Sequence, residues 1–450
     1  MSKEFFPPNR PAPFLVGAKF RETVISKIFF KFPLPTTLIG ILKENMYEYK
    51  YSKIDFQDVT ILMKLLHLNT FEKMEAFNYR NIPYGRFIVN PLIGKYGVKH
   101  YEISRFENIR NILILFRFIS SFRIINSILL KKDYSHVLFI NGRDSVGAAA
   151  QLAAYVNKKS VVTLEGGQGI FTIPKYGEWQ GNMHHWKVMQ RALDQTFSTY
   201  GEKFTTEDAL VYFENRYGYN SKWWKNADFA PLTDLPQKNK VVSFFTSSEE
   251  ETTTAPIGIS GKPDFDNYDQ VEILKKLHNI TLSRDMVLVI RLHPSNFTNR
   301  RKMKFVDDYF RNLTKNWQNT VLIKSSEKVN SYELARKSLV NFVFRSTLAS
   351  EFIIQNIPIY VVAQTENSKY AQKQQALTIK DMESVIDYPA NLSSKNMDGI
   401  RAYACYQEKF GQSFRYIKIL KKDNSIAQFE FWHNGIMLDV PRFKFKTFRA

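Results

Sequence analysis

Three groups of polar residues each follow a short apolar run between residues 286 and 362. Arginine presents a rigid fork of donors that suits phosphate, and hydroxyl groups at a helix start bind anions together with the free backbone N–H groups. Histidine can donate to a phosphate or ribose oxygen. These residue types suit a nucleotide-activated substrate. The residues are His293, Pro294, Ser325, Ser326, Arg345, Ser346 and Thr347, with Arg291 as a further phosphate-binding candidate.

The apolar runs before these groups are the elements that must position them. Strands that alternate with helices predict a parallel, doubly wound sheet, and ligands bind outside the carboxyl ends of its strands. Ordinary structural interpretations stay open, because Ser346-Thr347 is a common helix N-cap, His293-Pro294 is common in turns, and Arg345 could be solvated. The predicted strands are 286–292, 321–323, 339–344 and 358–362, and the predicted helices are 332–337 and 348–355.

The first half of the chain repeats this pattern. A predicted strand at 136–140 is followed by Asn141-Gly142-Arg143, and a helix at 144–156, with Asp144 or Ser145 as its N-cap, leads to a second strand at 160–164. Glu165-Gly166-Gly167 follows that strand. A carboxylate at a strand end can act as a general base, and the glycines allow a bulky ligand to come close. The alternative is a glycine-rich turn with a solvated glutamate.

The length of 450 residues predicts two domains and a tail. We expect an N-terminal domain at 1–232, a C-terminal domain at 238–410 and a basic extension at 411–450. The proline-containing stretch 228–240 is the linker candidate. The second domain then begins with a strand at 241–245, and Ser247 and Ser248 follow it. Helices are also expected at 269–277 and 396–410, and a hairpin with Asn434-Gly435 as its turn is expected in the tail.

The net charge of +20 indicates a polyanionic partner, which could be nucleic acid, anionic lipid or a sugar phosphate. No nucleic-acid-binding motif is visible. The single cysteine, Cys405, excludes an internal disulfide framework and a thiolate metal site. No apolar run is predicted to be long enough to span a bilayer and no signal peptide is visible, so we expect a cytoplasmic protein. The basic, apolar stretches 20–35 and 104–132 could be core helices or membrane-facing ones.

Taken together, these motifs resemble a family of bacterial capsule and surface-polysaccharide biosynthesis proteins with the GT-B glycosyltransferase fold. The His-Pro and Ser-Ser or Ser-Thr elements also resemble those of bacterial Kdo- and sialyltransferases and of teichoic-acid glycerophosphotransferases. In the Kdo- and sialyltransferases two acidic residues usually precede the glycine, whereas here Leu164 precedes Glu165. The matching pieces are Asn141-Gly142-Arg143, Glu165-Gly166, 245–250, 291–294, and Arg345-Ser346-Thr347 with Glu351.

The resemblance implies two doubly wound, Rossmann-like domains that face a cleft. The N-terminal domain would bind a glycan or lipid-linked glycan acceptor, and the C-terminal domain a CMP- or UDP-type nucleotide sugar. No cofactor and no metal would be needed, because helix N-termini and basic side chains hold the leaving phosphate. The transfer would be inverting, at the inner face of the cell membrane, with contact to anionic lipid and no nucleic-acid partner.

Three hypotheses follow. The first is a glycosyltransferase in which Glu165 is the general base, His293, Ser346, Thr347 and Arg345 or Arg291 hold the leaving phosphate, and Ser247 and Ser248 line the donor cleft. The second is a polyol-phosphate transferase that uses the same anion site. The third is a basic protein that binds nucleic acid or anionic lipid without chemistry, for which strong salt dependence is expected.

Overall fold

In the computed structural model the protein is described over residues 14–16, 56–100, 102–131, 136–140, 142–167, 170–173, 185–217, 240–249, 269–294, 300–346, 348–365, 369, 375–389, 397–409, 412–413, 417–423, 426–433 and 436–438. The basic stretch 20–35 and all of the linker candidate except Lys240 lie outside these residues.

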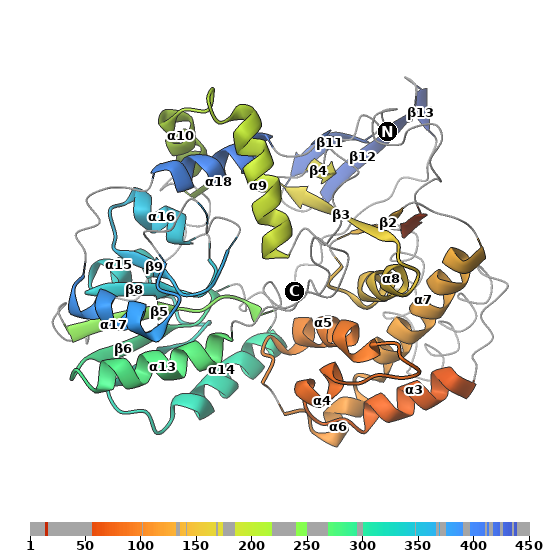
Figure 1. The fold of residues 1–450 in the computed structure, drawn as a ribbon, viewed down its shortest axis with the longest axis horizontal. Helices are drawn as coiled ribbons and strands as arrows, with labels where there is room; N and C mark the ends of the chain where they lie inside the picture. The colour runs from red at the N-terminus through yellow and green to blue at the C-terminus, as the bar shows by residue number, and fades with distance from the viewer. Residues whose placement is uncertain are drawn as a thin grey trace.

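The second half of the chain forms a parallel five-stranded sheet in the order β7-β6-β5-β8-β9 (Figure 1). Every predicted strand in this sheet lies within one residue of its expected bounds. The strands are β5 (Val241–Phe245), β6 (Val287–Arg291), β7 (Thr320–Ile323), β8 (Val340–Val343) and β9 (Ile359–Val361). The helices are α13 (Gln270–Leu282), α14 (Arg300–Thr314), α15 (Ser331–Arg336), α16 (Leu348–Ile354), α17 (Ile379–Asp387) and α18 (Met397–Lys409).

Helices cover both faces of this sheet, as expected for a doubly wound fold. Val241 and Phe245 of β5 belong to a core cluster with α15, α16 and α18. Val242 and Phe244 point to the other face and belong to a cluster with α13, α14 and α17. Strands buried on both faces consist of continuous apolar runs, which is why their positions could be predicted. Helix α13 continues to Leu282, beyond its predicted end at residue 277.

The first half of the chain forms a second sheet, in the order β1-β2-β3-β4-β10. β2 and β3 are parallel, as predicted, and β1, where no strand was predicted, pairs with β2 in parallel. β4 and β10 are added in antiparallel orientation. The α/β class with two Rossmann-like sheets, the arrangement predicted as GT-B-like, is therefore confirmed, and this sheet is mixed. The strands are β1 (Phe14–Val16), β2 (His136–Ile140), β3 (Ser160–Gly167), β4 (Ile170–Ile173) and β10 (Gln412–Ser413).

A helical layer packs against this sheet around one hydrophobic core. The layer occupies the lower right of Figure 1, and it includes the two helices into which the stretch 104–132 divides. Its helices are α3 (Phe56–Leu66), α4 (Phe71–Glu75), α5 (Tyr84–Tyr96), α6 (Arg105–Ile109), α7 (Ile112–Lys131) and α8 (Ser145–Val156).

Helix α7 corrects one prediction. By length and composition it is apolar enough to cross a membrane, and it is the one helix of the described residues that passes this test. In the structure it packs against α8 and α3, and Arg123 pairs with Asp58 of α3 at 2.6 Å. Its buried face includes Leu115, Phe118 and Ile125. These contacts favour the interpretation of a core helix with a basic face.

Helices α9 (Trp186–Tyr200) and α10 (Thr206–Tyr217) pack against α18 and share the core cluster on one face of the second sheet. The predicted domain boundaries near residue 232 fall outside the described residues and stay a prediction. The tail forms an antiparallel sheet of β11 (Ile417–Asp423), β12 (Ile426–His433) and β13 (Ile436–Leu438). His433 pairs with Ile436, which confirms the predicted hairpin.

Candidate functional site

The loops that follow β5, β6 and β8 are tied together at the carboxyl edge of the second sheet. The Thr246 N–H donates to the Arg291 carbonyl at 3.0 Å, and the Thr246 hydroxyl accepts from the His293 N–H at 2.9 Å. The Ser247 hydroxyl donates to the Arg345 carbonyl at 3.0 Å. Three of the predicted donor-binding segments are therefore brought together. We call residues 246–249 the β5 loop.

This edge contains the topological switch point of the sheet. β5 is the central strand, with β6 on one side and β8 on the other. The chain first builds outward through β6 and β7 and then returns to add β8 and β9. Loops on the two sides of such a strand diverge, and ligands of open α/β sheets bind in the crevice between them. The Ser247–Arg345 hydrogen bond crosses this point.

Arg345 has a strained backbone directly after β8. Its φ of 141° lies in a region that side-chain-bearing residues rarely adopt. Such a conformation costs about 1–3 kcal/mol and is often found where function requires it. The guanidinium carbon lies 5.5 Å from the ring centre of buried Phe344. The loop thus holds a cation at the switch point.

Ser346 behaves as a helix cap. Its hydroxyl accepts a hydrogen bond from the Leu348 N–H at 3.2 Å, next to the start of α16. Glu351, in the first turn of that helix, accepts a hydrogen bond from the Tyr332 hydroxyl. Thr347 lies outside the described residues. The N-cap interpretation of this motif is therefore supported for Ser346, and the phosphate role of its hydroxyl stays a prediction.

Arg291 is buried, with only 4% of its surface exposed, although a phosphate-binding role was considered for it. Its Nη1 donates to the Lys324 carbonyl and its Nη2 to the Glu327 carbonyl, the latter at 3.0 Å. Burial lowers the pKa of Arg291 to about 10, so it stays charged at neutral pH. Arg291 therefore fixes the loop after β7.

The predicted donor-side serines are largely enclosed by the protein. Ser247 and Ser248 are buried, and Ser248 accepts a hydrogen bond from the Lys302 ammonium at 3.3 Å. Ser325 is buried too, and its N–H donates to the Asp307 carboxylate at 3.2 Å. These contacts give the serines structural partners. The half-buried residues at this edge are His293, Ser326, Arg345, Ser346 and Glu351, and Pro294 is exposed.

The loop after β2 carries the acceptor-side candidates. Gly142 has a φ of 82°, and its carbonyl accepts from the buried Gln151 amide at 3.0 Å. A Cβ on Gly147 would lie 2.6 Å from the Gly142 Cα, so the loop passes directly over the start of α8. Asp144 caps that helix as predicted, by accepting from the Val146 and Gly147 N–H groups. Arg143 is half-buried, and Asn141 lies outside the described residues.

Glu165 lies within a strand, whereas we expected a glycine-rich loop after Leu164. β3 pairs with β2 through Leu164 and then with β4 from Glu165 to Gly167. Glu165 pairs with Thr172 of β4. The sequence prediction ended the strand too early because Gly166 and Gly167 favour turns. Glu165 nevertheless lies at the carboxyl end of the parallel part of the sheet, and its role as base stays a prediction.

A polar cluster beside the β5 loop was not predicted. Glu249 is 5% exposed, and it accepts a hydrogen bond from the Lys99 N–H of the first half of the chain. His100 pairs with Asp269 at 2.6 Å. In the sequence, Glu249 begins a run of three glutamates that resembles a solvated loop, and His100 is an isolated histidine. Only the contact between distant segments reveals them.

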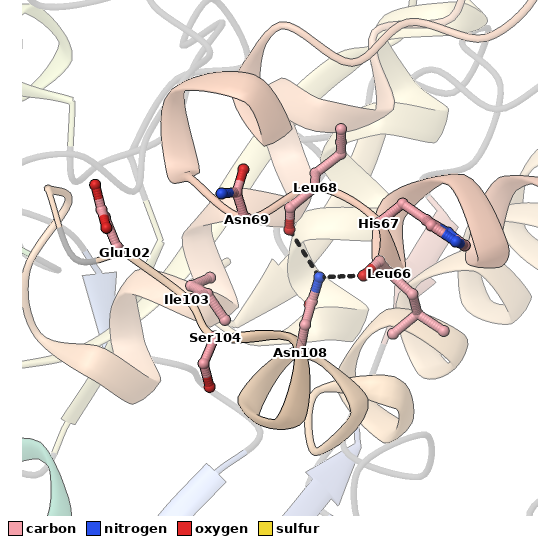
Figure 2. Close-up of a pocket in the computed structure, with 8 residues that line it drawn as sticks. All are labelled: Leu66, His67, Leu68, Asn69, Glu102, Ile103, Ser104 and Asn108. Atoms are coloured by element: carbon pink, nitrogen blue, oxygen red, sulfur yellow. Dashed lines mark hydrogen bonds between the residues drawn. The ribbon is translucent and has the colours of Figure 1, made fainter.

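Within the described residues no group of three or more His, Cys, Asp or Glu side chains could hold a metal ion. A cavity of about 430 Å³ lies between the end of α3 and α6 (Figure 2). In it the Asn108 amide donates to the carbonyls of Leu66 and Leu68, both at 2.7 Å. Asn108 thus joins α6 to the end of α3, and the cavity contains none of the predicted site residues.

No protein-family model and no curated protein sequence matches the chain. The beta-Kdo 2,4-transferase KpsC of Thermosulfurimonas dismutans is 10% identical, with a TM-score of 0.37 over 61% of this chain and 79% of that one. The UDP-GlcNAc 2-epimerase of Neisseria meningitidis bound to UDP-GlcNAc is 16% identical, with a TM-score of 0.24 over 71% and 84%. The calicheamicin glycosyltransferase CalG4 is 11% identical, with a TM-score of 0.26 over 70% and 79%. Likenesses of this size carry no argument about the reaction.

Proposed function

We propose that the protein is a glycosyltransferase that moves a sugar from a nucleotide-sugar donor to a growing surface glycan. One observation carries the proposal. The loops after β5, β6 and β8 meet at the topological switch point, where Arg345 is held in a strained backbone and bonded through its carbonyl to Ser247. A cation fixed in advance at that place suits the phosphate of an activated substrate.

The chemistry assigned to these residues is a displacement at the anomeric carbon of the donor. Glu165 takes the proton of the acceptor hydroxyl as its oxygen bonds to that carbon, and the bond from carbon to the nucleotide phosphate breaks. Arg345 and His293 then stabilise the negative charge on the departing phosphate. The donor lies on the second sheet and the acceptor on the first. The reaction needs no metal ion, and the product has inverted configuration at that carbon.

The first test is a thermal-shift screen of CMP, UDP, GDP and their sugars. A nucleotide that binds only the folded protein raises its melting temperature, by the equivalent of about 2.7 kcal/mol at a hundred times its dissociation constant. We expect a CMP- or UDP-type ligand to do so. If none of these ligands shifts the melting temperature, the donor assignment is wrong.

Arg345→Ala should weaken binding of that nucleotide by roughly 10- to 100-fold, as expected for a charge-assisted contact to phosphate. Arg284→Ala is the matched control, because Arg284 pairs with Asp387 at 2.6 Å on the same half of the protein. Both affinities can be measured by calorimetry. Equal affinities in the two variants would remove Arg345 from the site, and unchanged binding by His293→Ala would remove His293.

Glu165→Gln tests the proton transfer separately. Nucleotide binding should be retained, and turnover should fall by roughly 10²- to 10⁴-fold. Wild-type turnover in a folded Glu165→Gln protein would exclude Glu165 as the base. Product analysis with a panel of nucleotide sugars and nucleotide-diphosphate alcohols then separates sugar transfer from polyol-phosphate transfer.

A further inference from the structure

The segment that follows α5 contacts the second half of the chain through successive residues. Gly97 ends α5 with a φ of 80°, and a Cβ there would lie 2.6 Å from Val306 Cγ2 and 2.9 Å from Lys302 Cε. Helix α14 therefore packs directly on this turn (Figure 1). We call residues 97–100 the junction segment. Only glycine fits at its first position, because both the backbone conformation and the neighbouring helix exclude a side chain.

The apolar part of the junction belongs to the core of the second half. Val98 is 1% exposed and lies in the cluster that covers one face of the second sheet. Just before the turn, the Tyr96 ring meets the Phe305 ring of α14 edge to face at 5.0 Å. These contacts fix the segment, since closely packed apolar groups do not slide freely over one another.

The polar part of the junction reaches the β5 loop. The Lys99 N–H donates to the Glu249 carboxylate, the last residue of that loop. The next residue, His100, pairs with Asp269 at 2.6 Å. Asp269 caps α13 with its other oxygen, which accepts from the Val271 N–H at 2.9 Å. The first half of the chain therefore contacts both the β5 loop and the start of α13.

The start of α13 returns to the same loop. Gln270 is buried, and its amide accepts from the Ser247 N–H at 2.7 Å and donates to the Ser247 carbonyl at 3.4 Å. Lys302 of α14 holds the neighbouring Ser248. The β5 loop is thus held from the junction, α13 and α14, and through Ser247 from the loop after β8.

We propose that the junction segment positions the β5 loop, with Lys99 and His100 as positioning residues that couple the first half of the chain to the edge where the donor would bind. The coupling itself is a property of the fold, and only the description of this edge as a donor site rests on the proposed function. The protonation of Glu249 and His100 determines the stability of the contacts between the junction segment and the β5 loop.

The electrostatics give the direction of this dependence. Burial raises the pKa of Glu249 to about 7 from 4.5, and the hydrogen bond to Asp269 raises the pKa of His100 above 6.5. The junction segment therefore binds more protons when its contacts with Glu249 and Asp269 are formed than when they are broken. These contacts weaken as pH rises through neutrality. For Asp269, burial acts to raise the pKa, but the bonds from His100 and the α13 backbone outweigh it and lower the pKa. The stabilisation that Asp269 contributes is lost only as pH falls below 3.8.

The groups that act on this cluster come from several elements. Lys99 and Lys302 contribute positive charge, and Lys99 also pairs with Glu75 of α4 at 3.3 Å. On α14, burial and the nearby carboxylates raise the pKa of Tyr309, so its hydroxyl stays neutral. Glu272 adds a more distant negative charge. Glu249 and His100 are thus the groups of this set whose raised pKa values produce the expected dependence.

Amide hydrogen exchange of the full-length protein tests the proposal. The N–H groups of Lys99, Thr246 and Ser247 report the junction and the loop, because each makes one of the bonds described. Their protection factors, corrected for the intrinsic rate, should fall roughly three- to tenfold between pH 6 and pH 8 in the wild type. In Glu249→Gln this dependence should be largely lost, since the amide accepts from Lys99 but does not titrate.

His100→Ala should lower the protection of Ser247 at pH 6 roughly two- to fivefold, the size expected for a half-exposed pair. His100→Gln should restore part of this protection, because it can donate to Asp269, but without the pH dependence of histidine. Asp387→Asn is the control. It changes a pair of the same 2.6 Å length between α17 and Arg284, which follows the end of α13 away from the junction.

Equal protection of Thr246 and Ser247 in the wild type, His100→Ala and Glu249→Gln at every pH would overturn the proposal, as would a change confined to Lys99. Amide protection in α7 shows whether each variant is folded. If Glu249→Gln does not fold, His100→Gln still tests the His100–Asp269 pair. UDP and CMP titrations of the same proteins separate the two proposals. If neither nucleotide binds, the proposed function is wrong, and the exchange data still test the junction segment. If a nucleotide binds but the protection of the β5 loop is the same in all variants, only the proposal about the junction segment is wrong.

Discussion

The loop after β2 and the loop after β5 occupy corresponding places, each between a parallel strand and a helix, yet they are held in different ways. In the first, Gln151 bonds the Gly142 carbonyl from a distance of nine residues in the sequence. In the second, Ser247 is bonded to Gln270 and Arg345, which are 23 and 98 residues away. These bonds connect the first loop to the helix that follows it, and the second loop to several distant segments of the fold.

This difference predicts which of the two loops responds to a change elsewhere in the molecule. A loop held by its own helix keeps its geometry as long as that helix forms. A loop held from four segments keeps its geometry only when all of them are in place, so it responds to binding, protonation or movement at any one of them. The β5 loop is of the second kind.

The largest effect is expected for Arg291→Met, on the long-range side of the comparison. The substitution removes the charged donors that bond to the carbonyls of Lys324 and Glu327. The free energy of unfolding should fall by about 3 kcal/mol, since two part-buried hydrogen bonds from a charged group are lost together. Urea denaturation measures this. The control Arg284→Met removes a partly exposed pair and should cost less than about 1 kcal/mol. Similar losses of stability in both variants would mean that the hydrogen bonds of Arg291 do not hold the loop after β7.

Gly147→Ala tests the local loop. Alanine favours a helix over glycine by up to about 1 kcal/mol, but the new Cβ would lie 2.6 Å from the Gly142 backbone. Overpacking costs about 1–3 kcal/mol, so we expect a net destabilisation of roughly 1–2 kcal/mol. Nucleotide affinity should not change, because the effect stays within the loop after β2 and α8. A variant that is more stable than the wild type would show that the close approach is wrong.

The two buried glutamines make the comparison sharper. Gln151→Ala and Gln270→Ala each leave a buried carbonyl without its donor and should each cost roughly 1–2 kcal/mol by urea denaturation. Their effects on function should differ. Gln270→Ala frees Ser247 and should weaken nucleotide binding, whereas Gln151→Ala should leave it unchanged. Calorimetry on the pair decides this, and equal effects on affinity would contradict the distinction between local and long-range loops.

The same distinction explains what could be predicted from sequence. The strands of the second sheet were predicted to within one residue because they are buried on both faces and form continuous apolar runs. Their carboxyl ends follow from these positions, so the polar groups at residues 293, 325 and 345 could be assigned to one edge. The N-cap of α8 could be predicted to be Asp144 or Ser145, since a cap depends on neighbours in the sequence, and it is Asp144.

The long-range contacts could not be predicted in this way. Arg291 and Ser248 were predicted to bind the donor, and the sequence did not indicate that each also bonds to a residue far away in the chain. Glu249 appears in a run of glutamates that would normally be solvated, yet it is buried and accepts a hydrogen bond from Lys99 of the junction segment. β3 continues past Leu164 because β4 is available to pair with it, which the glycines alone do not indicate.

The smallest effect separates two aspartates that do the same local job. Asp144 and Asp269 each cap a helix by accepting from two backbone N–H groups. Asparagine also caps well, so Asp144→Asn and Asp269→Asn should each change the free energy of unfolding by less than about 1 kcal/mol at pH 8.

Asp269→Asn also removes the charge that raises the pKa of His100. That stabilisation is present below pH 6.5 and is lost as pH rises through the raised pKa, so the cost of Asp269→Asn should grow from pH 8 to pH 6. The cost of Asp144→Asn should stay constant, since backbone donors do not titrate. Urea denaturation at both pH values measures the two costs, and a parallel dependence in the two variants would show that the His100–Asp269 pair adds nothing beyond the cap.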